Sequence, residues 1–113
     1  MTWTDKLDEM KSNLRELNKA APEVTKAFHG LDTAAKASGA LDGKTLELIA
    51  LAIAVADRCE PCIEFHVTAL IRAGGTREEL AAMLAVCVQM GGGPSLMYSA
   101  KTLACFDEFS AKE

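Results

Sequence analysis

A ten-residue stretch, DRCEPCIEFH at residues 57–66, carries two cysteines and a histidine at spacings that could support thiol chemistry. Cys59 and Cys62 are separated by two residues, and His66 follows Cys62 by four. Such a pair can cycle between dithiol and disulfide, or it can bind a metal through its thiolates. It can also consist of small buried residues next to a core histidine. The spacing alone leaves these three interpretations open.

Pro61 lies between the cysteines and fixes the start of a helix, because proline is tolerated in the first turn and disfavoured later. We therefore expect Cys59 just before the helix and Cys62 in its first turn, where the helix dipole favours the thiolate. His66 then shares a face with Cys62, so its imidazole could accept or return a proton. Cys59, at the helix end, is predicted to be the more exposed thiol and to exchange with partners.

A metal site at this stretch would use Cys59, Cys62 and His66 as three ligands. Structural zinc sites usually show a second ligand pair at standard spacing, and the sequence contains none. The missing pair favours redox chemistry. A non-catalytic oligomeric module whose CxxC holds a metal stays the alternative from a different functional class.

The remaining polar and sulfur-containing residues are expected to have structural roles. Cys87 and Cys105 occur at core spacing within apolar helices, which is typical of small buried residues. Glu60 and Glu64 flank the motif and are expected to be solvated. Tyr98 is expected to have a packing role, and His29 is expected to lie at the surface or between helices.

The composition restricts the possible classes of protein. The 113 residues suffice for one domain with a single core, and only 5% of them are aromatic, so small aliphatic side chains must build that core. A net charge of −4 argues against a nucleic-acid partner. The longest apolar run, residues 48–56, is far shorter than the roughly 20 residues of a membrane helix. We expect a cytoplasmic protein, since the polar N-terminal residues do not resemble a secretory signal.

Hydrophobic periodicity predicts six helices and no strands. Their expected positions are about residues 3–21, 22–38, 42–56, 61–74, 76–90 and 95–109. Asp42 is a favoured N-cap for the third helix, and Thr76 with Glu79 has the pattern of a capping box. The run GGGPS at residues 91–95 is expected to be a flexible break.

Apolar residues on three of these helices indicate how they pack. The first helix has one narrow apolar stripe, formed by Trp3, Leu7, Met10, Leu14, Leu17 and Ala21. Val24, Phe28, Leu31 and Ala35 are expected to form the inner face of the second helix. The third helix is apolar almost all round from residue 48 to residue 56, which predicts burial on all sides. In so small a protein, such burial indicates subunit contacts as well as an internal core.

The run LDGKTLELIALAIAVADRCEPCIEFHVTALIRAGGTREEL resembles the core of the alkylhydroperoxidase D-like branch of the carboxymuconolactone decarboxylase family. The matching features are Glu47 early in an Ala-rich helix, the CxxC pair and then His66. The later GGGPSLMYSAKTL resembles the start of that family's final helix. The resemblance implies one all-α domain over residues 1–113, with N-terminal helices in 1–40 and the CxxC core in 41–110. It also implies a homotrimer or homohexamer assembled through apolar helices.

The same resemblance implies an enzyme that reduces organic hydroperoxides in antioxidant defence, or one that reduces disulfides. Cys59 and Cys62 match the family's redox cysteines, and His66 and Glu47 match its proton relay. No bound cofactor or metal is implied, but an external dithiol, such as a lipoyl protein or a thioredoxin-like donor, is needed to reduce the disulfide. A carboxymuconolactone decarboxylase-like activity is the alternative enzyme, although the decarboxylase branch usually lacks the CxxC.

Pro61 departs from the family pattern, and Glu47 fits the pattern only with a geometric difficulty. Some family members have a second histidine where this chain has Pro61, so a weaker or different peroxidase activity is expected. Glu47 lies twelve residues before Cys59. If the chain reverses near residues 58–60, Glu47 and His66 are offset by roughly 9 Å along the helix axes. The relay role of Glu47 therefore rests on the resemblance. Of the two thiols, Cys62 is expected to attack the peroxide and Cys59 to resolve the product.

Overall fold

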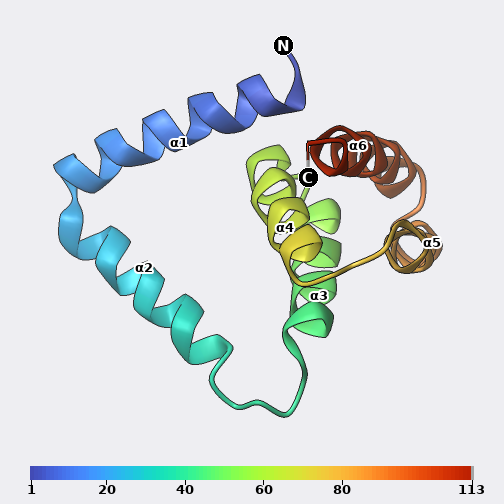
Figure 1. Cartoon of the computed structure of the whole chain (residues 1–113), viewed down its shortest axis with the longest axis horizontal. Helices are drawn as coiled ribbons and strands as arrows, with labels where there is room; N and C mark the ends of the chain where they lie inside the picture. Colours follow the sequence, from blue (N-terminus) through green and yellow to red (C-terminus); the bar gives the residue numbers. More distant parts are fainter. Residues whose placement is uncertain (113) are drawn as a thin grey trace.

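Six α-helices and no β-strand form the chain in the computed structural model, which describes residues 1–112 (Figure 1). The helices are α1 (Trp3–Ala20), α2 (Pro22–Ala35), α3 (Gly43–Ala56), α4 (Glu60–Arg72), α5 (Arg77–Gly91) and α6 (Gly93–Ser110). The prediction of an all-α, six-helix chain is confirmed. Three boundaries differ from the expected ones by two residues or more: α2 ends three residues early, α4 ends two residues early and α6 begins two residues early.

The helix starts follow the caps read from the sequence. The Asp42 side chain accepts a hydrogen bond from a backbone N–H in the first turn of α3. Thr76 and Glu79 form the reciprocal capping box of α5. Pro22 and Pro61 occupy the first turns of α2 and α4. These local signals satisfy or remove N–H groups that the helix itself leaves unpaired, and so they fix where each helix begins.

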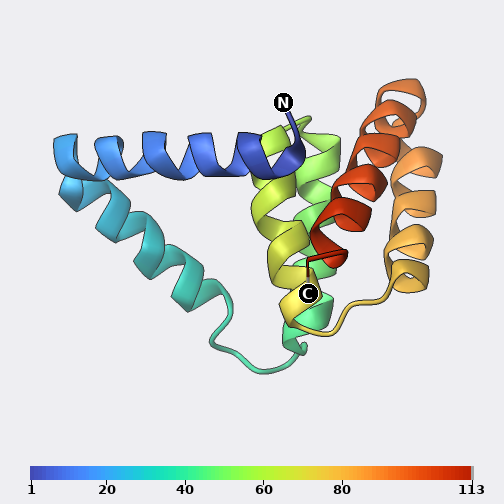
Figure 2. The same cartoon turned by 45° about the horizontal axis from the view of Figure 1, so that its top comes forward.

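Helices α3 to α6 form the core, and both ribbon views show α3 beside α4 and α5 beside α6 (Figures 1 and 2). Most of the fully buried side chains are aliphatic: Leu51, Val55, Ile63, Val67, Leu70 and Leu80. Burying each such side chain contributes about 1.5–3 kcal/mol before entropy losses are counted. The core is therefore aliphatic, as the composition predicts, and it holds α3 and α4 in a fixed relation.

The first half of α1 docks on this core. Leu7 is buried, and Trp3 packs against the core cluster. Glu108, near the end of α6, accepts hydrogen bonds from the backbone N–H groups of Trp3 and Thr4 at 3.2 and 2.8 Å. Farther along, Leu14 is already 42% exposed. The predicted apolar stripe is thus buried only near its N-terminal end.

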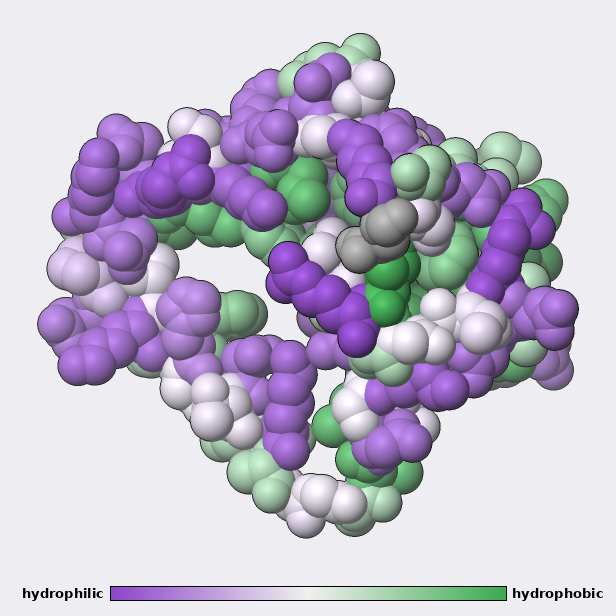
Figure 3. All heavy atoms as spheres, in the orientation of Figure 1, coloured by the Kyte–Doolittle hydropathy of each residue, from purple (hydrophilic) through white to green (hydrophobic). Residues whose placement is uncertain are grey.

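The second half of α1 and the whole of α2 form an arm that projects from the core and ends at Lys36, the C-cap of α2 (Figure 2). Among the helices of residues 1–112, α2 contacts α1 and no other. Its residues Val24, Phe28 and Leu31 are 67%, 67% and 64% exposed. The space-filling view shows open space between the arm and the core, bordered by both polar and apolar side chains (Figure 3). The prediction that this face of α2 packs on an internal core is wrong for the single chain, because α1 runs past the core before α2 turns back.

One face of α3 is also open. Leu51, Ala54 and Val55 are buried, but Ile49 and Ile53 are 45% and 56% exposed. Burial of α3 on all sides is therefore not achieved within one chain. Within residues 1–112, no helix combines the length and the apolar character needed to cross a membrane.

Helices α5 and α6 meet at a sharp corner instead of the expected flexible break. Gly92 alone separates them, with φ at +70°, in the left-handed region that favours glycine. A Cβ added to Gly91 would collide with the side chain of Ser95. The glycines of this run therefore allow a close helix–helix corner.

Candidate active site

The connection between α3 and α4 sets the geometry of the CxxC motif. It is three residues long, from Asp57 to Cys59, and Arg58 adopts a left-handed backbone with φ of 56°. Left-handed backbone is costly for a side chain with a Cβ, and it allows the chain to reverse within these few residues. Helices α3 and α4 consequently pack against each other and present the motif at one end of the core.

Cys59 and Cys62 are joined by a disulfide across the N-terminus of α4. Cys59 is the N-cap, and its Sγ accepts a hydrogen bond from the Cys62 N–H at 3.3 Å. When the bond is reduced, the same N–H and the positive end of the helix dipole will stabilise a Cys59 thiolate. Both cysteines are where the sequence predicts them, before the helix and in its first turn.

The exposure of the two cysteines is the reverse of the prediction. Cys62 is exposed, whereas Cys59 is only partly exposed. The physical reason is the turn: as N-cap, Cys59 is tucked beneath the end of α3, and its N–H donates to the Ala54 carbonyl at 3.1 Å. An external thiol therefore reaches the disulfide more easily at the Cys62 sulfur.

Glu47 and His66 meet across the α3–α4 interface. Glu47 Oε2 lies 2.8 Å from His66 Nδ1, and the Glu47 carboxyl is buried. The offset of roughly 9 Å expected from the sequence is too large. Because α3 ends at Ala56 and α4 begins at Glu60, Glu47 lies nine residues before the turn and His66 six after it. The difference of three residues is about 4.5 Å of helix rise, which the two side chains span directly.

The contact with Glu47 orients the imidazole of His66. An ionised carboxylate can only accept hydrogen bonds, so Nδ1 carries the proton that is donated to Glu47. Nε2 is then left with the lone pair and can accept a proton. This arrangement matches that of other histidines whose tautomer is fixed by a carboxylate behind the ring.

His66 and the disulfide line the same shallow pocket, of about 270 Å³. Its other walls come from the end of α3: Ala50, Ile53, Ala54 and Asp57. The disulfide, the imidazole and an apolar wall therefore border one small space. The pocket can hold a small molecule next to a sulfur atom.

Lys36, a residue outside the CxxC motif, contacts the second oxygen of Glu47. Its Nζ lies 3.2 Å from Glu47 Oε1 and 3.3 Å from Asp32 Oδ1. Burial acts to lower the pKa of Lys36, but the two carboxylates outweigh that effect and raise the pKa above its ordinary value. No sequence signal could have revealed Lys36, because it lies at the end of the exposed arm, outside the motif.

Comparison with known proteins agrees with this geometry. A profile of the carboxymuconolactone decarboxylase family matches residues 22–104, which span Glu47, both cysteines of the motif and His66. The chain belongs to the carboxymuconolactone decarboxylase family. The resemblance noted in the sequence is thereby confirmed at the level of the family.

Several relatives of this family member are similar over nearly their whole length. An uncharacterized protein of Cupriavidus necator is 42% identical over 94% of each chain, and uncharacterized protein 4 of the cox locus of Paracoccus denitrificans is 37% identical over 84% of this chain and 86% of its own. A crystal structure of a carboxymuconolactone decarboxylase family protein from Legionella pneumophila superposes with a TM-score of 0.92, at 46% identity over 96% of each chain.

A second solved structure carries a functional description. It is a carboxymuconolactone decarboxylase family protein from Thermotoga maritima that has been suggested to take part in an antioxidative response. It covers 94% of this chain and 91% of its own, with 28% identity and a TM-score of 0.81.

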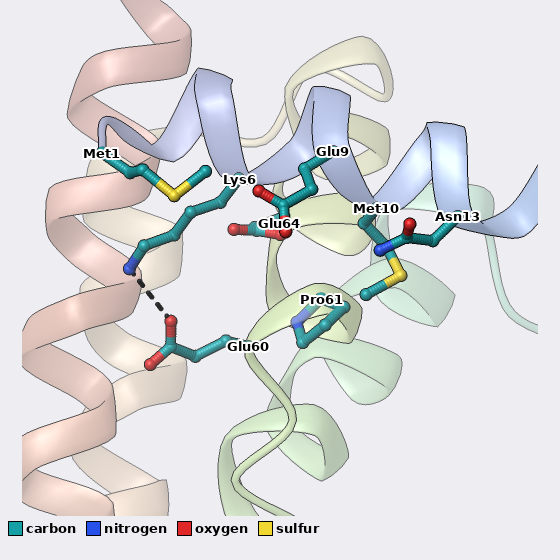
Figure 4. A pocket seen from close by; sticks show the side chains of 8 residues that line it. All are labelled: Met1, Lys6, Glu9, Met10, Asn13, Glu60, Pro61 and Glu64. Atoms are coloured by element: carbon teal, nitrogen blue, oxygen red, sulfur yellow. Dashed lines mark hydrogen bonds and ion pairs between the residues drawn. The ribbon is translucent and has the colours of Figure 1, made fainter.

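The glutamates beside the motif do not behave as predicted. Glu64 is buried, 1% exposed, and its Oε2 has no hydrogen-bond partner within residues 1–112. Burial raises the pKa of this carboxyl. Figure 4 shows Glu64 between α1 and α4, in a pocket of about 230 Å³. The expectation that Glu64 is solvated is wrong, because the docked α1 covers that face of α4.

Glu60 forms ion pairs with two lysines and is therefore not freely solvated. It accepts from Lys101 at 2.8 Å and from Lys6 at 3.2 Å, the latter drawn in Figure 4. The hydrogen bond from Lys101 is the main cause of the lowered pKa of this carboxyl. The pair of lysines ties the start of α4 to α1 and α6.

The other candidates lie away from the pocket. Cys105 is buried, and burial together with the charge of Glu64 raises the pKa of its thiol to about 12. Cys87 is partly buried, and burial raises the pKa of its thiol as well. Tyr98 packs against the core and His29 is exposed, as predicted.

The residues of the motif are not arranged as a metal site. Within residues 1–112, no three His, Cys, Asp or Glu side chains converge as ligands of a metal ion. Of the expected ligands, Cys59 and Cys62 are bonded to each other and His66 Nδ1 contacts Glu47. The arrangement suits dithiol chemistry better than metal binding.

Proposed function

We propose that this protein is a thiol-dependent oxidoreductase that reduces organic hydroperoxides through a Cys59–Cys62 dithiol. The observation that carries the proposal is the meeting of the disulfide with the Glu47–His66 pair at one pocket. The Thermotoga relative with its suggested antioxidative role supports the same class of activity.

The first step uses the reduced enzyme. The Cys62 thiolate attacks the distal oxygen of the hydroperoxide and the O–O bond breaks, which leaves Cys62 as a sulfenic acid and releases an alkoxide. His66, having taken the thiol proton at Nε2, donates it to the alkoxide to give an alcohol. Glu47 stabilises the imidazolium that exists between these two transfers.

The second step restores the disulfide seen in the structure. The Cys59 thiolate attacks the Cys62 sulfenic sulfur, the S–S bond forms, and hydroxide leaves as water after protonation. An external dithiol then attacks the exposed Cys62 sulfur and displaces Cys59 as a thiolate. The helix N-terminus favours that departure, because it stabilises the Cys59 anion. A second attack within the donor releases Cys62 and leaves the donor oxidised.

The walls of the pocket fit an alkyl hydroperoxide. Ala50, Ile53 and Ala54 provide an apolar surface next to the thiols, and burial of alkyl carbons on it would contribute to binding. The external dithiol, such as a lipoyl or thioredoxin-like protein, implies a reducing compartment, and we propose the cytoplasm.

We also propose that the chain assembles as a homotrimer or homohexamer. The exposed apolar residues of α2, namely Val24, Phe28 and Leu31, have no partner in the single chain of residues 1–112, and neither does the Ile49–Ile53 face of α3. Exposed apolar surface of this extent usually marks an interface. A second copy of the chain is the occupant that the family resemblance favours.

Trapping of the sulfenic acid tests the proposed cycle. Reduced Cys59→Ser is treated with one equivalent of cumene hydroperoxide and then with dimedone, and the adduct is located by mass spectrometry. The proposal predicts a dimedone adduct on Cys62, whereas the wild type under the same conditions re-forms the disulfide and takes up none. An unmodified Cys62 thiol in this variant after peroxide treatment would contradict the cycle.

A further inference from the structure

We propose that Lys36 is a positioning residue of the relay, holding Glu47 ionised and aimed at His66 so that Nε2 stays free to accept a proton. The functional meaning of this role rests on the proposed thiol chemistry. The effect of Lys36 on the His66 imidazole is present in the oxidised protein, however, and can be tested without measuring turnover.

Glu47 is buried and has two partners that can carry positive charge. Its carboxyl is 7% exposed, and each of its oxygens has a different partner: Oε2 contacts His66 Nδ1 at 2.8 Å and Oε1 contacts Lys36 Nζ at 3.2 Å. A buried carboxylate is costly unless opposite charge or hydrogen bonds compensate it. His66 can compensate it fully only by becoming an imidazolium, which is no longer a base. Lys36 supplies the positive charge in its place.

The other charged groups around His66 cannot take over this task. Asp57 lines the same pocket from the end of α3, and Asp32 from α2 contacts Lys36 itself. Both are acids, and both favour a protonated imidazole. The CxxC thiolates of the reduced enzyme act in the same direction. Lys36 is the cation bonded to the carboxylate of the relay, and so it opposes protonation of His66.

Lys36 also joins the arm to the site. It is the C-cap residue of α2, a helix that contacts α1 and no other helix of residues 1–112. Its side chain reaches Glu47, a glutamate buried in α3. The position of the arm therefore determines whether the relay has its counter-charge.

The test is the ring titration of the two histidines by NMR in oxidised wild type, Lys36→Met and Lys36→Arg. We expect the midpoint of His66 to rise by about 0.5–1 pH unit in Lys36→Met, the size of one lost unit charge several ångströms away that is screened largely by water. Lys36→Arg keeps the positive charge, so its His66 midpoint should stay close to that of the wild type. Exposed His29 serves as the internal reference.

Lys44→Met is the matched control. Lys44 is also paired with a glutamate, Glu79, at 2.8 Å, and its side chain is 35% exposed against 43% for Lys36. It should leave the His66 midpoint unchanged. An unshifted midpoint in Lys36→Met, or an equal shift in Lys44→Met, would overturn the proposal. If Lys36→Met does not fold, Lys36→Gln takes its place with the same criteria.

Peroxide turnover then separates this proposal from the proposed function. If the His66 midpoint moves as expected but neither wild type nor variants reduce peroxide, Lys36 keeps its role and the peroxidase assignment fails. If wild type turns over and the midpoint does not move, the peroxidase assignment stands and the role of Lys36 is lost.

Discussion

Glu47 Oε2 and His66 Nδ1 lie 2.8 Å apart although the two residues are nineteen positions apart along the chain. The three-residue turn between α3 and α4 brings them together, and Cys62 lies one helical turn before His66 on α4. The imidazole and the Cys59–Cys62 disulfide thus line one pocket, and the carboxylate lies behind the imidazole.

Removing the carboxylate behind His66 should slow peroxide reduction. In Glu47→Gln the amide no longer selects the Nδ1–H tautomer or stabilises the imidazolium. We expect a fall of about 10–100-fold in the rate of sulfenic acid formation, and about 100-fold or more in His66→Gln. Stopped-flow measurements of the reduced enzyme with cumene hydroperoxide give these rates. Glu78→Gln, which changes an exposed glutamate in the first turn of α5, is the control. A wild-type rate in Glu47→Gln would remove the carboxylate from the relay.

The four cysteines should differ in their reactivity toward iodoacetamide after reduction. Thiolate is the reactive form, and burial raises the pKa of the Cys105 thiol to about 12 and that of Cys87 above its ordinary value. We expect Cys62 and Cys59 to be alkylated first at pH 7.5, and Cys105 to stay unmodified in the folded protein. Peptide mapping over time reports the order. Early modification of Cys105 would show that its surroundings are more open than described.

The arm should mediate self-assembly. Multi-angle light scattering should give three or six times the 12.0 kDa of one chain. Phe28→Glu places a charge on the apolar face of α2, where Phe28 is 67% exposed, and should shift the population to smaller species. Lys26→Glu is the control, because Lys26 is an exposed, polar residue of the same helix. This variant should keep the wild-type distribution of species. A 12.0 kDa particle for the wild type would refute assembly.

Replacing the buried Glu64 should stabilise the protein at neutral pH. Because burial raises its pKa in the folded state, the unfolded chain loses this proton first as pH rises. The stability linked to the protonated carboxyl is therefore complete at low pH and is lost as pH rises through the folded-state value. Glu64→Gln stays neutral, so its advantage in urea unfolding should grow from about pH 4 to pH 7.

Glu60→Gln, four residues away on the same helix, should behave in the opposite way. The pKa of Glu60 is lowered, first by the hydrogen bond from Lys101, so its contribution is present at neutral pH and is lost as pH falls through the folded-state value. We expect a loss of about 0.5–1 kcal/mol at pH 7 that shrinks on acidification. If both variants changed in the same direction with pH, the contrast between a buried, unpaired carboxyl and a paired one would be wrong.

Local signals in the sequence predicted much of the fold. The N-caps Asp42 and Thr76, the first-turn prolines and the hydrophobic periodicity define six helices, because these interactions involve residues close together in the chain. The same signals placed Cys59 and Cys62 correctly at the start of α4. The direct Glu47–His66 contact could not be derived, because it depends on where α3 ends and on the tight turn at Arg58.

Long-range relations account for the misplaced residues. Glu64 seemed solvated because nothing nearby in the sequence shows that α1 covers it. The apolar face of α2 seemed internal because periodicity reveals which residues share a face and does not reveal what that face contacts. Lys36 gave no signal at all, since its partner Glu47 is brought to it by the return of the chain between α2 and α3.

The most direct test of the central claim is steady-state reduction of cumene hydroperoxide with dihydrolipoamide, comparing wild type with Cys62→Ser and Cys105→Ser. The proposed dithiol cycle predicts turnover by the wild type, loss of turnover in Cys62→Ser, and retention in Cys105→Ser provided that the variant folds. Turnover by Cys62→Ser at the wild-type rate would contradict the account, because no step of the cycle can proceed without that sulfur.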